Sequence, residues 1–124
     1  MAERPVTTLT IPAPARMLTL NAERKADAHD RASIVRLWRE AAWATALQAK
    51  VSPMKRIKIT VHVGQRGSVL ADAANHYPAV KACIDGLVDA KVIEDDGPGF
   101  VRNIDQWAPR RTERDVIVLE LEEV

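Results

Sequence analysis

A stretch in the middle of the chain alternates strictly between apolar and polar side chains, and it constrains the fold more than any other feature. In residues 55–63, an isoleucine or valine at every second position alternates with a basic or polar residue such as Lys58 or His62. This period of two predicts a β-strand with one face in a core and the other toward solvent. Because such a strand needs neighbouring strands and a layer over its apolar face, the chain is expected to contain a sheet.

Three further segments have the composition of strands. Residues 6–11 are rich in threonine and β-branched side chains, residues 100–107 form a weaker run, and residues 115–121 contain the segment 116–119, which is apolar on both faces. A strand that is apolar on both faces belongs in a sheet that is covered on both sides. Arg110 and Arg111 are expected in a connector before the last strand.

Two segments have the spacing of amphipathic helices. Residues 30–50 carry an apolar stripe that includes Trp38, a predicted core residue, and Asp30 can cap the first turn. Residues 75–90 carry a second stripe, and Asn75 can cap that helix. The resulting order β-α-β-α-β-β predicts an α+β (α/β) fold, in which two helices pack against a mixed four-stranded sheet within one domain, 1–124.

Composition limits the cellular compartment in which the protein is expected. The single cysteine, Cys83, excludes an intramolecular disulfide, suits a reducing compartment and is expected to be a small buried hydrophobe. No run approaches the roughly 18 apolar residues of a membrane span, and the first residues lack the apolar core of a signal peptide. We therefore expect a cytoplasmic protein with no membrane partner.

Charge is unevenly distributed although the formal net charge is only +1. Residues 1–81 contain 13 Lys and Arg against 6 Asp and Glu, whereas residues 82–124 contain 5 against 11. A basic part followed by an acidic part is compatible with a protein that grips phosphates and carries a carboxylate metal site. An unevenly charged solvated surface gives the same pattern, so charge alone leaves both interpretations open.

Three groups of polar residues at or beside the second expected helix have the chemistry of a metal-dependent site. They are Asp72 with Asn75, Lys81 with Asp85, and Glu94 with Asp95 and Asp96. Separated carboxylates with a lysine suit Mg²⁺ and the hydrolysis of a phosphodiester, since Mg²⁺ takes oxygen ligands and the lysine stabilises charge on phosphate. A lysine and an aspartate four residues apart also form ordinary surface ion pairs on helices, so spacing alone does not decide.

The order of these residues resembles a family signature. The chain reads Asp72-Ala-Ala-Asn75-His-Tyr-Pro78-Ala-Val-Lys81-Ala-Cys-Ile-Asp85-Gly86-Leu87, followed by Val92-Ile-Glu-Asp95-Asp96. This is similar to the RusA family of Holliday-junction resolvases, whose signature is an Asp-x-Asp-Asn loop, a helix with a lysine and an Asp-x-Leu, and a downstream Asp-Asp. The proline before the lysine resembles the actinobacterial and phage branch. The tight motif covers residues 72–96, and about 100 residues match in order and character.

The resemblance implies a homodimeric endonuclease that binds four-way DNA junctions by shape and nicks two strands symmetrically with Mg²⁺ or Mn²⁺. By position, Asp72, Lys81 and Asp96 match the catalytic residues. Asp72, Asp95 and Asp96 would hold the metal, with Asn75 and Asp85 in support. One position departs from the signature, because Ala74 stands where the family has its second aspartate. A weakened or inactive protein of this fold that only binds branched DNA is therefore the alternative, and a small interaction module unrelated to DNA is a third.

Basic residues around the signature are the expected DNA contacts. They are Lys55, Arg56, Lys58, Arg66, Arg110 and Arg111. The histidines are too scattered for a zinc site. His76, next to Asn75, is expected to have a surface or capping role.

The chain length between the two outer aspartates leaves the assembly of the site open. A helix over 75–90 spans about 22 Å, and the six residues from Ala90 to Asp96 reach roughly 20 Å when extended. Asp96 can therefore return to Asp72 within one subunit only by running back along the helix. In a homodimer, Asp72 could instead meet the partner subunit's Asp96, and a twofold axis would create two such sites.

Overall fold

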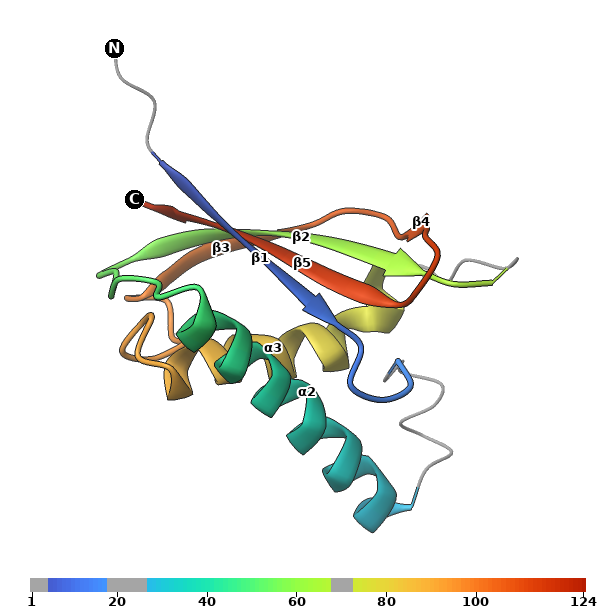
Figure 1. Cartoon of the computed structure of the whole chain (residues 1–124). Coiled ribbons are helices and arrows are strands. Elements are labelled where there is room, and N and C mark those ends of the chain that lie inside the picture. The colour runs from blue at the N-terminus through green and yellow to red at the C-terminus, as the bar shows by residue number, and fades with distance from the viewer. Residues whose placement is uncertain (1–4, 18–26, 68–72) are drawn as a thin grey trace.

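The computed structural model describes residues 5–17, 27–67 and 73–124, and in these ranges two helices pack against one face of a mixed sheet (Figure 1). The elements in order are β1 (Val6–Pro12), α2 (Ala28–Gln48), β2 (Ile57–Gln65), the short 3-10 helix η1 (Ala73–His76), α3 (Tyr77–Asp89), β3 (Val101–Gln106), β4 (Arg110–Arg111) and β5 (Val116–Glu123). The predicted α+β class and the order of strands and helices are confirmed.

The sheet has the strand order β1-β5-β2-β3, and β4 pairs with the end of β2. β5 lies between β1 and β2 and is antiparallel to both, whereas β2 and β3 are parallel because α3 crosses over between them. The sheet therefore has five strands, one more than predicted. The expectation of a connector at Arg110 and Arg111 was wrong, since these residues pair in parallel with Gly64 and Gln65.

One face of the sheet holds the core, and the other carries partly exposed side chains. The alternation in β2 is confirmed, with Ile57, Ile59, Val61 and Val63 at most 1% exposed. The expectation that β5 is covered on both faces was wrong. Its odd-numbered residues from Ile117 to Leu121 are buried, but Val118 on the opposite face is only partly buried, because both helices lie in a single layer (Figure 1).

The N-cap of helix α2 lies three residues earlier than expected. Asp27, not Asp30, is the N-cap, and its side chain accepts a hydrogen bond from the backbone N–H of Asp30 (2.7 Å). Asp30 lies in the first turn and forms an ion pair with Arg16 instead. Trp38 is fully buried, as predicted, and its indole N–H donates to the carbonyl of Arg16 (3.2 Å).

Helix α3 lies directly against α2 at a glycine. A Cβ atom added to Gly86 would come within 2.4 Å of the backbone oxygen of Arg39 and 2.8 Å of the Cβ atom of Ala42. An ion pair between Arg39 and Asp89 (2.5 Å) joins the two helices beside this contact. Glycine is otherwise unfavourable inside a helix, so here its missing side chain sets the separation between the two helices.

We expect Gly86→Ala to destabilise the fold. Alanine normally stabilises an exposed helix position by about 1 kcal/mol relative to glycine, but here its Cβ atom meets backbone that can move only if the helices separate. The free energy of unfolding, measured by urea denaturation, should fall by about 1–3 kcal/mol, as for an overpacked core. Gly99→Ala is the control, because nothing lies within 4 Å of its added Cβ atom. A Gly86→Ala protein more stable than wild type would contradict the close packing.

Candidate functional site

Lys81 joins helix α3 to the loop that follows it. Its Nζ atom donates a hydrogen bond to Oδ1 of Asp85 (2.7 Å), one turn further along the helix, and a second to Oδ2 of Asp96. All three side chains are partly exposed on the side of α3 that faces away from the core. The structure therefore brings together the expected catalytic lysine, one expected catalytic aspartate and one supporting aspartate.

The chain reaches this arrangement by turning back at the end of α3. The backbone N–H of Lys91 donates to the carbonyl of Val88 (3.0 Å), and Lys91 has a left-handed backbone with φ of 63°. The N–H of Val92 donates to the carbonyl of Leu87 (3.0 Å), which completes a Schellman motif at the helix end. Asp96 then lies beside Lys81 in the same chain. The loop after α3 therefore runs back along the helix, as a site within one subunit requires.

The interaction between Lys81 and Asp96 keeps both side chains charged. Partial burial of Lys81 opposes its charge, but hydrogen bonds to Asp85 and Asp96 outweigh this effect and raise the pKa of Lys81. The hydrogen bond from Lys81 lowers the pKa of Asp96 and outweighs the opposing effect of burial. Lys81 is therefore suited to stabilising negative charge and not to accepting a proton at neutral pH.

The acidic residues of α3 divide into two groups. Asp85 belongs to the Lys81 cluster, whereas Asp89, one turn later, pairs with Arg39 of α2. Hydrogen bonding to Arg39 lowers the pKa of Asp89. Lys81 and Asp85 therefore belong to a polar cluster with Asp96, whereas Asp89 forms an ion pair that joins α3 to α2.

The expected metal ligands are only partly within the described residues. Asp95 and Asp96 follow one another in the loop after α3, and Asp72 lies outside the described residues. In the described ranges, no group of three or more His, Cys, Asp or Glu side chains is arranged to hold a metal ion. The donors that are present are carboxylate oxygens, which suit Mg²⁺, and the lowered pKa of Asp96 keeps its carboxylate ionised.

The expected helix cap is absent. Asn75 lies in η1, and α3 starts one residue after His76, which has no side-chain capping hydrogen bond. The prediction that Asn75 caps the helix was wrong, because the short 3-10 helix precedes α3 and moves the cap position. Asn75 is partly buried next to the start of α3.

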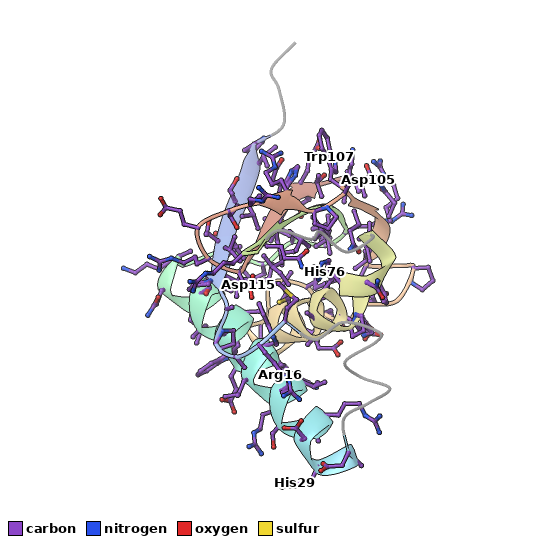
Figure 2. All side chains as sticks on the ribbon, turned by 90° about the vertical axis from the view of Figure 1, so that its right-hand side faces the viewer. Arg16, His29, His76, Asp105, Trp107 and Asp115 are labelled. Carbon is purple, nitrogen blue, oxygen red and sulfur yellow. The ribbon has the colours of Figure 1, made fainter. Side chains whose placement is uncertain are left out.

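His76 is buried, so the expectation of a surface role was wrong; it occupies the N-cap position of α3, but its side chain makes no capping hydrogen bond. Its side chain lies between β2 and the start of α3 (Figure 2), where Nε2 is 3.3 Å from Oε1 of Gln65 and Nδ1 has no hydrogen-bond partner among the described residues. Burial lowers the pKa of His76, and the nearby Asp115 opposes this shift. Nothing in the local sequence distinguishes this histidine from an exposed one, since its burial depends on the packing of β2 against α3.

The expected DNA contacts do not form one patch. Lys55 and Arg56 precede β2, while Arg66, Arg110 and Arg111 lie at its far end, roughly 30 Å away at about 3.3 Å per residue. β4 and the end of β2 lie on the same side of the molecule as the start of α3 (Figure 1), where Gln65 contacts His76.

The open face of the sheet carries paired side chains that sequence analysis did not single out. Lys58, an expected DNA contact, pairs there with Asp105 (3.3 Å). His62 pairs with Glu120 (2.7 Å), and its ring lies 5.0 Å from that of Trp107. Alternation placed Lys58 and His62 on this face, but their partners come from β3, β5 and the segment after β3, which only the sheet topology reveals.

Comparison with known proteins adds no family assignment. No known family model matches the chain, and no curated protein matches it. In the described ranges, no helix is both long enough and apolar enough to cross a membrane. The functional interpretation therefore depends on the site and on the resemblance of residues 72–96.

We expect Lys81→Met to raise the pKa of Asp96, because it removes the hydrogen bond and the positive charge that lower it. The pair stabilises the fold above the ordinary aspartate pKa, and this stabilisation is lost as the pH falls through the lowered pKa. The pKa of Asp96 can be measured from its carboxyl ¹³C shift. Lys58→Met, which breaks the pair with Asp105 on the other side of the sheet, is the control. An unchanged pKa of Asp96 in Lys81→Met would contradict the bridge.

Proposed function

We propose that the chain is a RusA-type, Mg²⁺-dependent endonuclease that resolves four-way DNA junctions by paired symmetric nicks. The observation that supports this proposal is the pairing of Lys81 with Asp96, which are 15 residues apart in the sequence. The lysine and the downstream aspartate of the signature thereby meet in one site. On α3, Lys81 lies about 6 Å along the helix axis from the first residue of the helix.

Each residue has a distinct task in this proposal. Asp72, Asp95 and Asp96 supply the carboxylate oxygens that hold the metal, and Asp85 holds the Lys81 side chain in place. Mn²⁺ would suit the same oxygen ligands. When bound, the metal supplies an activated water and steadies the charge on the leaving oxygen. Lys81, kept protonated by its neighbours, donates to the phosphate oxygen on which negative charge develops.

The start of α3 is where we place the rest of the site. Asp72 precedes Tyr77 by only five residues, and Asp96 has already returned to the same part of the helix in the same chain. A site assembled within one subunit is therefore the simpler arrangement, and a homodimer would carry two of them. A twofold axis between the subunits suits two nicks in a symmetric junction.

Arg66, Arg110 and Arg111 are the proposed phosphate contacts nearest to this site, because they lie at the end of β2 beside the start of α3. Phosphate contacts position a protein on DNA and carry little sequence information, which suits recognition of a branch by its shape. Lys55 and Arg56, at the other end of β2, would meet a different part of the DNA. We further propose that the protein acts on this DNA in the cytoplasm.

A second candidate function follows from one position. Ala74 replaces an aspartate of the signature, so the metal site has one carboxylate fewer. A site with fewer carboxylates binds Mg²⁺ more weakly. The protein would then bind branched DNA without cutting it.

We expect Asp72→Asn and Asp96→Asn each to reduce cleavage of a synthetic four-way junction by at least a hundredfold. Each change removes a carboxylate ligand and leaves the arginines at the end of β2 in place. Junction affinity, measured in a gel-shift assay with Ca²⁺ in place of Mg²⁺, should stay within about threefold of wild type.

Asp89→Asn is the matched control, because Asp89 lies on the same helix but pairs with Arg39 outside the site. It should cut at the wild-type rate. Wild-type cleavage by Asp96→Asn would remove that residue from the mechanism. Wild-type protein that binds the junction and leaves it intact would support the second candidate function.

A further inference from the structure

A half-open cavity of about 900 Å³ lies at the end of α3 that is away from His76. Its walls come from residues 53–56 before β2, from Val88 and Lys91 at the helix end, and from the loop that leads to Phe100. The volume is in the range of small-molecule sites. Glu94, which lines the cavity, is two residues before Asp96 in the sequence. The cavity lining does not include Lys81 or Asp96.

The walls of this cavity are fixed by backbone hydrogen bonds. The N–H of Met54 donates to the carbonyl of Val92 (2.7 Å), and the carbonyl of Phe100 accepts from Ile57 (2.8 Å). The N–H of Phe100 donates to the carbonyl of Gly97 (2.9 Å). The cavity is therefore preformed, which reduces the entropy lost when a ligand binds.

The lining combines apolar side chains with positive charge. Met54, Val88 and Phe100 are partly buried and expose apolar surface to the cavity. Lys55, Arg56 and Lys91 surround it, with Glu94 as the one acidic residue of the lining. Among the described residues, no ion pair involves any of these three cations. An anion with a flat apolar part complements this combination, because cations bind phosphate and aromatic side chains stack on bases.

Lys91 has a structural counterpart elsewhere in the chain, which provides a matched control for its place in the cavity lining. It has a left-handed backbone at the helix end, where glycine is the residue without steric cost. Lys50 occupies the equivalent position after α2, with φ of 53° and the same pair of backbone hydrogen bonds, but it does not line the cavity. The two lysines thus share a backbone conformation and differ in their surroundings.

We propose that this cavity binds a nucleoside phosphate, with the phosphate at Lys55, Arg56 and Lys91 and the base against Phe100 and Met54. The ligand is either a free nucleotide or a nucleotide within a single DNA strand. The inference does not depend on the proposed cleavage reaction, because binding is measured without a divalent cation.

The test is an NMR titration of the ¹⁵N-labelled full chain with dAMP, deoxyadenosine, inorganic phosphate and a short single-stranded oligo(dA). We expect saturable shifts from dAMP at the amides of Lys91, Glu94 and Phe100, and weaker binding of deoxyadenosine and of phosphate alone. Tighter binding of the oligonucleotide at the same amides would identify a DNA strand as the source of the ligand. Tighter binding of dAMP would identify the free nucleotide.

Lys91→Gly and Lys50→Gly are the matched pair of variants. Glycine accepts the left-handed backbone, so both proteins should fold at least as stably as wild type. Lys91→Gly should weaken dAMP binding roughly tenfold, as expected for the loss of one charge-assisted contact. Lys50→Gly removes the same charge outside the cavity and should bind as wild type does.

Three results would overturn the proposal. The first is an equal loss of affinity in both variants, which would indicate a general effect of net charge. The second is an absence of saturable shifts at the cavity amides up to millimolar dAMP. The third is binding of inorganic phosphate as tight as that of dAMP, which would leave no role for the apolar lining.

Discussion

The close contact of α3 with the backbone of α2 at Gly86 is the constraint on which the arrangement of the site depends. With no side chain at this position, the two helices share a single layer beneath the sheet. The rotation of α3 about its axis is then fixed. Its apolar stripe, which includes Val80 and Leu87, meets the core, and Lys81 and Asp85 point away from it. The polar cluster is thus a consequence of how two apolar surfaces pack.

The C-terminal end of α3 determines how Asp96 reaches Lys81. Because Lys91, two residues after the end of α3, has a left-handed backbone, the chain reverses at once and buries Val92 and Ile93. The loop then places Asp96 beside Lys81. Lys81 and Asp96 neutralise one another in this arrangement. A cation bound by Asp96 therefore competes with Lys81, and a phosphate bound by Lys81 competes with Asp96. A lysine that is already held between two carboxylates can move toward an incoming phosphate without a change of its own protonation state.

Local pattern predicted most of the elements, and tertiary packing decided what it missed. Period-two alternation located β2, and helical spacing located α2 and α3 to within a few residues. The pairing of Arg110 and Arg111 with β2 could not be predicted, since a two-residue strand has no periodicity. The burial of His76 depends on β2 packing against α3.

The candidate site was only partly accessible to sequence analysis. Helical spacing indicated the pair of Lys81 and Asp85. The contact with Asp96 required knowledge of how the loop turns back, which spacing alone left open. Asp85 and Asp89 lie one turn apart on the same helix, and the position of Arg39 on the neighbouring helix separates their roles. Contacts between elements, rather than positions within them, are what the structure adds.

The most direct test of the account is to map the cuts that the wild-type protein makes in a synthetic four-way junction, on all four strands, with Mg²⁺ and with EDTA. We expect two nicks in opposite strands, placed symmetrically about the branch point, with Mg²⁺ and none with EDTA. A junction that is bound yet intact in both Mg²⁺ and Mn²⁺ would contradict the account.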